Sequence, residues 1–193
     1  ASTLSKFNPW WTRGAVPQEL LGTHRRPALG TVLGHAPSRF AVLLYGLRRV
    51  GKTTLLYQVI AHLLESGVDP LRIFYFSFDE SPADIDPVVA AYEEVVLKKR
   101  LGDAGRVYFF FDEVQKVSGW QSRVKILYDL HPSLKFFLSG SASVSLRKPS
   151  VESLAGRMID VFVEPLSFAE FLEWKDVSLD PARPELSHRE AAP

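Results

Sequence analysis

Five stretches of the chain are almost continuously apolar and have the length of a β-strand. A strand that faces solvent on one side alternates apolar and polar residues, so an unbroken apolar run predicts a strand that is buried on both faces. β-Branched and aromatic side chains, which favour strands, fill these runs. The predicted strands cover residues 39–46, 72–79, 106–114, 134–141 and 158–166.

Between the strands, apolar residues recur at three- and four-residue spacing, which predicts amphipathic helices. From residue 52 to 66 the apolar positions share one face, and Gly67 ends the pattern. Another helix is predicted with Asp86 as its N-terminal cap and Pro87 at its first position, where proline costs no hydrogen bond. Residues 120–130 also carry a helical pattern.

A short helix is predicted over residues 167–174, opened by Ser167, with Glu170 placed to complete a capping box. The alternation of strands and helices indicates an α/β fold with a parallel sheet covered on both faces. Ligands of such folds bind beyond the carboxyl ends of the strands. Functional side chains are therefore expected directly after each strand.

The pattern divides the chain into three parts. Residues 1–38 carry Pro, Gly and His in irregular order together with aromatic residues, and we expect an N-terminal arm that packs on the core or on a partner. Residues 39–175 contain the strands and helices of the core domain. Residues 176–193 show no periodicity, which predicts an unstructured tail or a truncated linker.

Composition narrows the class of protein. Of 193 residues, 46% are hydrophobic and 23% are charged, which is typical of globular proteins. The net charge of +1 gives no overall sign of a nucleic-acid or membrane partner, although a local basic patch stays possible. The lack of cysteine excludes disulfides, thiol catalysis and Cys-ligated zinc. Because the apolar runs are short and a secretory signal pattern is missing, we expect a cytoplasmic protein without membrane contact.

The turn after the first predicted strand has the pattern G-x-x-x-x-G-K-T. Glycines let the backbone turn tightly, so that several N–H groups point at one centre and form a nest for phosphate oxygens. The start of the following helix adds partial positive charge. In this pattern the lysine reaches the β- and γ-phosphates and the first threonine holds Mg²⁺. The predicted nucleotide-binding residues are Gly46, Leu47, Arg48, Arg49, Val50, Gly51, Lys52, Thr53 and Thr54.

The third predicted strand ends in two carboxylates, Asp112 and Glu113. Asp112 is placed to support Mg²⁺ through its water shell, and Glu113 to polarise a water for attack on the γ-phosphate. An acidic pair that merely ends a strand is the alternative, but its order and separation from the loop favour the functional interpretation. A small-molecule kinase has little need of such a glutamate, so the pair favours an ATPase.

Five other polar positions are open to two interpretations each. Ser139 and Ser141 follow the fourth predicted strand, either to hold the attacking water or sense the phosphate, or as an ordinary Ser/Gly turn. Arg157 precedes the fifth strand, either to reach the γ-phosphate of a neighbouring copy or as a structural arginine. Arg48 and Arg49 either brace the loop or reach a partner, or they are solvated surface residues.

The chain resembles the prokaryotic group of AAA-type P-loop ATPases in five ordered motifs: GLRRVGKTTLL, FFFDEVQ, LSGSAS, LAGR and EPLSFAEFL. The resemblance covers about residues 39 to 175. It implies a P-loop NTPase three-layer sandwich of the additional-strand type, whose parallel five-stranded sheet has the order 5-1-4-3-2. It also implies ATP and Mg²⁺ as ligands.

Residue by residue, the resemblance implies a Walker A motif over residues 46–54 and a Walker B motif at Asp112 and Glu113. Thr53 and Asp112 would serve the metal. One of the two serines matches the first sensor position, and the arginine before the fifth strand lies where these families often carry an arginine finger. The catalytic residues so implied are Glu113, Lys52, Ser139, Ser141 and Arg157.

Two functions remain open. The first is hydrolysis of ATP–Mg to ADP and phosphate by an AAA-type motor or switch, and the presence of Glu113 supports it. The second is a nucleotide-dependent binding module that turns over little and docks a partner or nucleic acid, the latter by resemblance only. No helical lid is evident after Trp174, so we expect weak hydrolysis. Members of the group usually continue into a C-terminal region, so we expect an N-terminal ATPase core with a C-terminal domain outside this chain. Self-association stays open, since assembly in these families also involves the lid.

Overall fold

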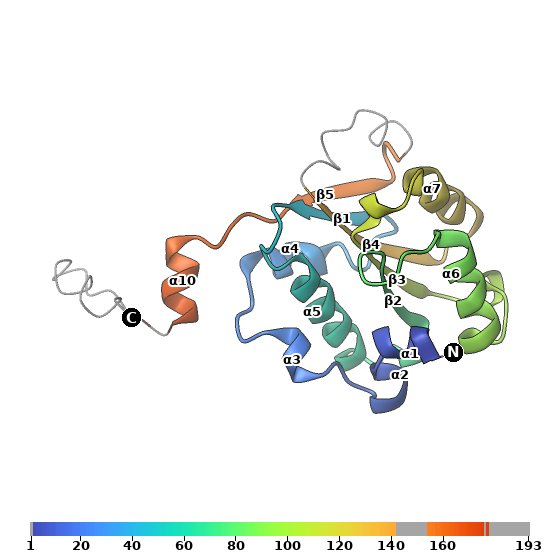
Figure 1. Cartoon of the computed structure of the whole chain (residues 1–193), viewed down its shortest axis with the longest axis horizontal. Coiled ribbons are helices and arrows are strands. Elements are labelled where there is room, and N and C mark those ends of the chain that lie inside the picture. The colour runs from blue at the N-terminus through green and yellow to red at the C-terminus, as the bar shows by residue number, and fades with distance from the viewer. Residues whose placement is uncertain (1, 142–153, 176, 178–193) are drawn as a thin grey trace.

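A five-stranded parallel sheet forms the centre of the computed structural model, which describes residues 2–141, 154–175 and 177 (Figure 1). The strand order is β2-β3-β4-β1-β5. Read from the opposite edge it is the predicted order 5-1-4-3-2, so the fold class is confirmed. The strands are β1 Ala41–Gly46, β2 Ile73–Ser77, β3 Val107–Asp112, β4 Leu134–Ser141 and β5 Met158–Phe162.

Strand boundaries agree with the sequence pattern at β4 and differ by one to four residues elsewhere. The largest difference is at β5, which ends at Phe162 and not at residue 166. The next N–H group, that of Val163, still donates to the Tyr45 carbonyl at 2.8 Å. Pro165 then has no N–H group to offer, so an apolar sequence cannot extend the ladder there.

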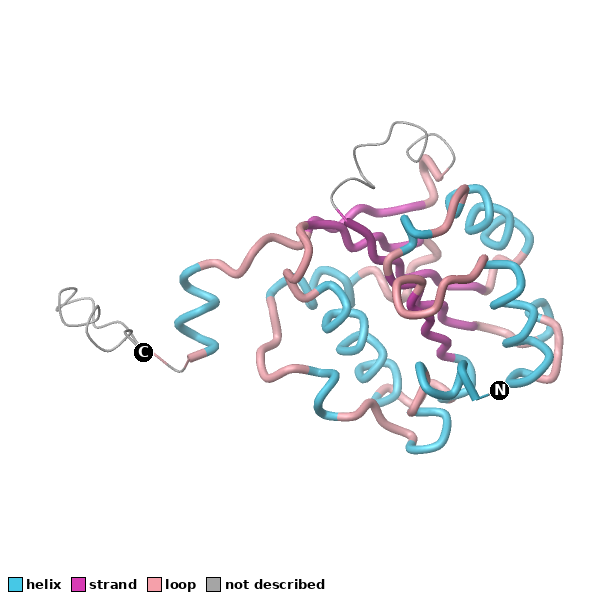
Figure 2. Tube along the Cα trace, viewed as in Figure 1, coloured by secondary structure: helices cyan, strands magenta, loops and turns pink. Residues whose placement is uncertain are grey.

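Helices cover both faces of the sheet, which gives three layers (Figure 2). On one face lies α5, and on the other lie α6 and α7 (Figure 1). Successive residues of one strand enter opposite cores: Phe109 and Phe111 pack with α6 and α7, whereas Phe110 packs with α5. In the described residues, the α-helices after β1 are α5 Lys52–Glu65, α6 Ile85–Tyr92, α7 Trp120–Leu130 and α10 Phe168–Trp174. The short 3-10 helices are η1 Pro70–Arg72, η3 Leu101–Asp103 and η4 Val114–Lys116, and η2 Glu93–Leu97 is a π-helical turn that continues α6.

One helix begins earlier than its sequence predicts. The N-terminal cap of α6 is Asp84, without a side-chain cap hydrogen bond, and Ile85 is the first helical residue. The prediction of Asp86 as the cap was therefore wrong. Both aspartates precede an apolar stripe, but Ile85 is fully buried and belongs to the helix, which places Asp86 in the first turn. By contrast, α10 has the predicted capping box between Ser167 and Glu170.

The first 34 residues form four short helices rather than irregular chain. They are α1 Ser2–Phe7, α2 Trp10–Arg13, α3 Gln18–Leu21 and α4 Pro27–Gly34. Their apolar side chains join the core, and Trp10 is fully buried against α5. Helices of four to eight residues have too few turns for a readable periodicity, so the sequence did not predict them.

Side chains from this N-terminal region close the outer edge of β2. The Asn8 amide donates to the Tyr75 carbonyl at 2.9 Å, and its Oδ1 accepts from the Tyr75 N–H at 2.7 Å. Both indole N–H groups of Trp10 and Trp11 donate to the Ile73 carbonyl, at 3.0 and 2.9 Å. Backbone groups that a further strand would use are thus already bonded.

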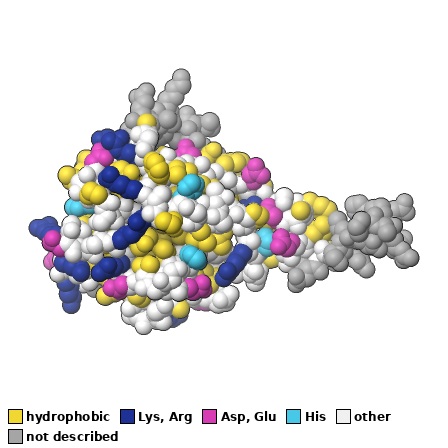
Figure 3. Space-filling view, turned by 180° about the vertical axis from the view of Figure 1, so that it is seen from behind, with side chains coloured by type: hydrophobic (Ala, Val, Ile, Leu, Met, Phe, Trp, Pro, Cys, Tyr) yellow, Lys and Arg dark blue, Asp and Glu magenta, His cyan; other side chains and the backbone are white. Residues whose placement is uncertain are grey.

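The surface mixes charges of both signs. On the face shown in Figure 3, Lys and Arg side chains gather over the half away from α10, with acidic side chains among them. No helix within residues 2–141 and 154–175 has the length and apolar character needed to cross a bilayer.

Candidate functional site

The loop between β1 and α5 has the backbone geometry that its glycines permit. A Cβ atom at Gly46 would lie 2.4 Å from the Val163 carbonyl oxygen, so β5 leaves no room for a side chain there. Gly51 has φ 91°, which glycine adopts readily, and Arg49 has φ 64°. The ammonium group of Lys52 donates to the Leu47 carbonyl at 2.8 Å and to the Gly46 carbonyl at 3.3 Å. The lysine therefore lies folded over the loop.

The Asp112 carboxylate is the centre of the site. Its Oδ2 accepts from the Thr53 hydroxyl at 2.7 Å and from the Tyr75 hydroxyl at 2.9 Å. Its Oδ1 accepts from the Ser139 hydroxyl. Asp112 is 3% exposed, so these three donors replace the water that a carboxylate would otherwise hold. Burial and the Asp112 charge raise the pKa of Tyr75 well above its ordinary range, so the phenol stays a donor.

Strand register explains why these residues meet. Ser77 pairs with Asp112 across β2 and β3, and Gly46 pairs with Ser141 across β1 and β4. All five strands run in one direction, so their carboxyl ends share one edge of the sheet. The loop follows β1 at this edge, which brings Thr53 to Asp112.

Glu113 is held in an unusual conformation beside Asp112. Its φ is 57°, in the left-handed region that non-glycine residues seldom adopt, and its N–H donates to the Ser139 hydroxyl at 3.0 Å. The Glu113 carboxylate accepts from the Gln115 side-chain amide. The other end of that amide, Oε1, accepts from the Ser141 N–H at 3.3 Å. Gln115 thus ties Glu113 to the end of β4.

The two candidate sensor serines have different surroundings. Ser139 is fully buried, and its hydroxyl bonds to Asp112 and to the Glu113 N–H. Ser141 is the last residue of β4 and is half-buried, with its N–H directed to Gln115. Ser139 therefore orients the acidic pair, whereas Ser141 lies at the open edge. The choice of sensor stays a prediction.

The structure brings the arginines to different places. Arg48 is 86% exposed and lies 3.8 Å from Asp79 in a surface ion pair. Arg157 precedes β5, at the amino edge of the sheet, opposite the loop. Its Nε donates to Asp129 of α7 at 2.8 Å. Arg157 consequently cannot reach the loop of its own chain, and an arginine-finger role would require a second copy.

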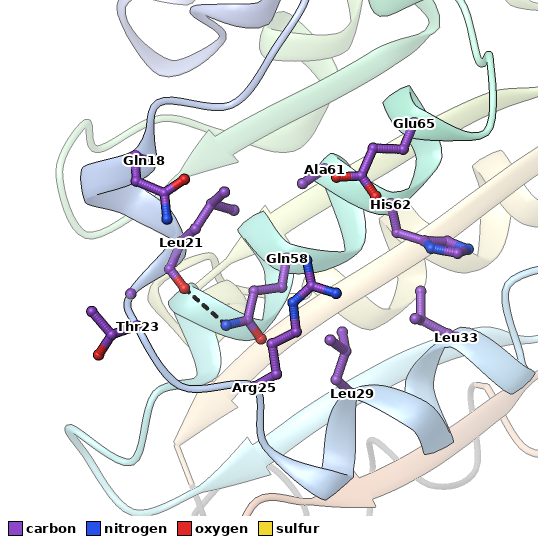
Figure 4. A pocket seen from close by; sticks show the side chains of 11 residues that line it. Gln18, Leu21, Thr23, Arg25, Leu29, Leu33, Gln58, Ala61, His62 and Glu65 are labelled. Atoms are coloured by element: carbon purple, nitrogen blue, oxygen red, sulfur yellow. Dashed lines mark hydrogen bonds between the residues drawn. The ribbon is translucent and has the colours of Figure 1, made fainter. Parts of the chain in front are cut away.

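Two cavities share Gly22, Thr23 and Gln58 as lining residues. One, of about 380 Å³, lies between α3, α4 and α5, and Figure 4 shows Gln58 extending across it toward Leu21. The other, of about 400 Å³, borders the loop. We call it the loop cavity. It is lined by Gly22, Thr23, His24, Arg26, Arg49, Val50, Gly51, Thr54, Leu55, Gln58, Pro165, Leu166 and Trp174.

Polar atoms at the wall of the loop cavity lack partners. The Gln58 side-chain amide donates to the carbonyls of Leu21 and His24, at 2.8 and 3.0 Å. In the described part of the chain, Gln58 Oε1 and His24 Nε2 are both buried and have no hydrogen-bond partner. Both atoms are shielded from solvent, so they lie behind the surface of the cavity.

Sequence analysis missed three residues that shape the site. Tyr75 was hidden within an apolar strand, where only tertiary structure shows that its hydroxyl meets Asp112. Gln115 belongs to the FFFDEVQ motif, and its position two residues after Glu113 was the available signal. Arg26 lies in the N-terminal region and bonds to the loop at the Val50 carbonyl, at 2.9 Å, and no sequence pattern indicates this contact. The predicted absence of a lid concerns residues 176 and 178–193, which lie outside the described residues.

A family model and two curated relatives match the chain. The family model described as "AAA domain" matches residues 38–172. An uncharacterized protein of Haemophilus influenzae is 31% identical over 140 residues, which are 72% of this chain and 34% of that protein. An uncharacterized protein of Methanocaldococcus jannaschii is 32% identical over 146 residues, 74% of this chain and 30% of that protein. The chain thus spans about a third of the length of these relatives.

Solved structures agree with the fold. A Walker-type ATPase of Pyrococcus abyssi matches with a TM-score of 0.54 and 19% identity, covering 92% of this chain and 65% of that one. Domain III of the Thermotoga maritima replication initiation protein DnaA matches with a TM-score of 0.52 and 18% identity, covering 93% and 80%. Since the family model spans both the loop and the end of β3, the chain belongs to the AAA-type P-loop ATPases.

Proposed function

We propose that the chain binds ATP with Mg²⁺ at the loop between β1 and α5 and hydrolyses it to ADP and phosphate, as an AAA-type motor or switch. One observation carries this proposal: the 2.7 Å contact between Thr53 Oγ1 and Asp112 Oδ2, with Glu113 next in the chain. Two oxygens of the kind that bind Mg²⁺ and a further carboxylate, that of Glu113, would then serve a triphosphate in the loop.

The loop supplies the binding of the triphosphate. Its backbone N–H groups lead into the N-terminus of α5, where partial positive charge favours phosphate oxygens. Lys52 bonds to two loop carbonyls, at 2.8 and 3.3 Å, which keeps its ammonium group at the loop. A bound phosphate would replace neutral acceptors with a charged one, which gives stronger hydrogen bonds.

The residues present fit a magnesium ion. Thr53 and Asp112 offer hard oxygen ligands, the kind that Mg²⁺ prefers, directly or through water. When bound, the ion neutralises charge on the β- and γ-phosphates. Tyr75 and Ser139 fix the Asp112 carboxylate by donating to its two oxygens. Orientation of a metal-binding carboxylate by such donors usually matters for affinity.

Glu113 is the proposed general base. Its carboxylate would accept a proton from the water that attacks the γ-phosphorus, as the bond to the bridging oxygen of ADP breaks. Ser139 fixes the Glu113 backbone, and Gln115 fixes the Glu113 carboxylate. Lys52 would stabilise the charge that develops on the phosphate oxygens.

The loop cavity is the proposed site of the base and ribose. It borders Val50, Gly51 and Thr54 of the loop and the first turn of α5. Its volume of about 400 Å³ is in the range of small-molecule sites, and it combines apolar lining residues with polar ones such as Thr23 and Thr54. Adenine offers both an apolar face and polar edges, which suits such a wall.

A binding module with little turnover is the second candidate. The observation that favours it is the hydrogen bond from Gln115 to Glu113, because a carboxylate engaged in that way is less available to a water. Such a module would hold ATP in order to dock a partner, a nucleic acid or another copy of the chain.

Replacement of Glu113 by glutamine separates the two candidates. The amide keeps the shape but cannot accept the proton, so we expect near-native ATP affinity and at least about a hundredfold slower phosphate release. Calorimetry and steady-state phosphate release measure the two quantities. A variant that hydrolyses ATP at the wild-type rate would contradict the role of Glu113. A wild-type chain that binds ATP without turnover, with or without partners, would favour the binding module.

A further inference from the structure

Helix α10 is joined to the rest of the fold by few contacts. In the described residues its side-chain hydrogen bonds to other elements go to Thr23 and Arg26. The Trp174 indole N–H donates to the Thr23 hydroxyl at 2.7 Å. Leu172 is buried, but Phe168 is 61% exposed and Trp174 47%. Figure 1 shows α10 at the end of the extended segment that leaves β5. An element with little buried apolar area detaches at low cost.

Arg26 donates hydrogen bonds to both the loop and α10. Its Nη1 donates to the Val50 carbonyl of the loop at 2.9 Å and to the Glu164 carbonyl after β5 at 2.8 Å. Its Nε and Nη2 donate to the two carboxylate oxygens of Glu170 in α10, at 3.0 and 3.2 Å. The planar guanidinium fork fits this set of acceptors, and a lysine ammonium cannot.

The Arg26–Glu170 pair is mostly shielded from water. The two side chains are 11% and 14% exposed, so each charge depends on the other. The Arg26 hydrogen bonds lower the pKa of Glu170 to about 2, with further lowering from the Ser167 N–H. Removal of one partner of such a pair leaves an uncompensated charge, which is costly. The contact between the arginine and α10 therefore depends strongly on both side chains.

The loop cavity lies between the elements that Arg26 joins. Val50 and Gly51 line it from the loop, Pro165 and Leu166 from the segment after β5, and Trp174 from α10. A ligand that fills this cavity contacts both walls. It therefore favours the arrangement in which α10 is docked, and by linkage docked α10 favours the ligand.

We propose that Arg26 is a positioning residue that couples nucleotide binding at the loop to the docking of α10. The inference rests on the proposed function, since ATP is the ligand. Arg26 does not contact the reacting atoms. Its guanidinium group bonds to both the Val50 carbonyl of the loop and the Glu170 carboxylate, so filling of the loop and docking of α10 favour each other.

The test compares ATP with inorganic tripolyphosphate, which carries the phosphates but cannot fill the loop cavity. Calorimetry gives both affinities, and hydrogen exchange gives the protection of residues 168–174. In the wild type, ATP should slow exchange in that segment at least about fivefold, and tripolyphosphate should slow it far less. In Arg26→Lys, ATP should bind at least about fivefold more weakly and no longer protect the segment, while tripolyphosphate affinity should change little.

Matched variants separate coupling from general loss of structure. Glu170→Gln should repeat the effect of Arg26→Lys, and the double variant should be no worse than either single one. Arg106→Lys is the control, because Arg106 also donates to three carbonyls, those of residues 36, 37 and 38, but far from the loop. It should leave the ATP-dependent protection of α10 unchanged. If Arg26→Lys fails to fold by circular dichroism, Glu170→Gln carries the test.

Three outcomes would overturn the inference. An Arg26→Lys chain with native ATP affinity and native protection of α10 would remove the coupling and leave the proposed function intact. If Arg26→Lys binds ATP and tripolyphosphate equally more weakly, and ATP still protects α10, then Arg26 only stabilises the loop. A folded wild-type chain that binds neither ligand would overturn the proposed function, and the inference with it.

Discussion

The hydroxyl oxygen of Thr53 lies 2.7 Å from Oδ2 of Asp112, although 59 residues separate them in sequence. The contact joins the helix after β1 to the end of β3. Because the same carboxylate oxygen also accepts from Tyr75, a change at any of the three affects the other two.

Nucleotide affinity should depend on Lys52. In Lys52→Ala the loop loses the flexible cation placed for the β- and γ-phosphates, with its charge-assisted hydrogen bonds. We expect at least about a tenfold loss of ATP affinity, on the order of 1.4 kcal/mol, by calorimetric titration. Lys125→Ala is the control, since Lys125 forms an exposed pair with Asp129 on α7. Unchanged ATP affinity in Lys52→Ala would refute the assignment of the loop.

Magnesium dependence should reveal the role of Tyr75. Tyr75→Phe removes the hydroxyl that donates to Asp112 at 2.9 Å and leaves the ring in the core. The carboxylate is then less well oriented, and we expect about tenfold more Mg²⁺ for half-maximal ATP binding. Tyr92→Phe loses a buried hydroxyl bond elsewhere, to the Leu71 carbonyl at 2.6 Å, and should not change this requirement. Identical Mg²⁺ curves for wild type and Tyr75→Phe would count against a metal at Asp112.

Arg157 should act only between copies of the chain, because it lies at the edge of the sheet opposite the loop. If it completes a neighbour's site, phosphate release per chain rises with protein concentration, and a mixture of Arg157→Ala with Glu113→Gln recovers part of the activity. Asp129→Asn is the matched variant, since it removes the negative charge from the partner in the same 2.8 Å contact but keeps the arginine. Equal losses in Arg157→Ala and Asp129→Asn, without rescue on mixing, would make the arginine structural.

Stability should rise with pH above about 8 because of Lys135. Burial lowers the pKa of this lysine from 10.5 to about 8, with a smaller effect of Arg106. Between these values the unfolded chain binds more protons than the folded one, so the free energy of unfolding rises with pH. From pH 8 to about 9.5 we expect a gain on the order of 1 kcal/mol in urea melts, and Lys135→Met should lack it. A flat profile in the wild type would show that the folded lysine keeps an ordinary pKa.

Much of the sheet could be predicted because each strand is an almost continuous apolar run. The loop residues and Asp112 were also identifiable from the sequence, since the glycine and lysine spacing and the acidic pair after the third strand are local patterns. The start of α6 was not, because Asp84 and Asp86 are both suitable caps and only the burial of Ile85 decides between them. Local patterns are poor guides to such boundaries.

Contacts made by single side chains across the fold were the part that sequence could not provide. Tyr75 is one aromatic residue among several in β2, and its register opposite β3 alone directs the hydroxyl to Asp112. Arg26 lies 144 residues from Glu170, and no periodicity links them. Such pairs depend on tertiary placement, which a single sequence does not encode in any short pattern.

The closure of β2 by Asn8, Trp10 and Trp11 makes the two edges of the sheet unequal. At β2 the side-chain amide of Asn8 takes the place of a neighbouring strand, so another chain cannot extend the sheet there. At the opposite edge, β5 pairs only with β1 in the described structure. Sheet growth from one molecule to the next is therefore one-sided: two chains can meet β5 to β5 and then stop, and an open-ended fibre has no second edge on which to continue.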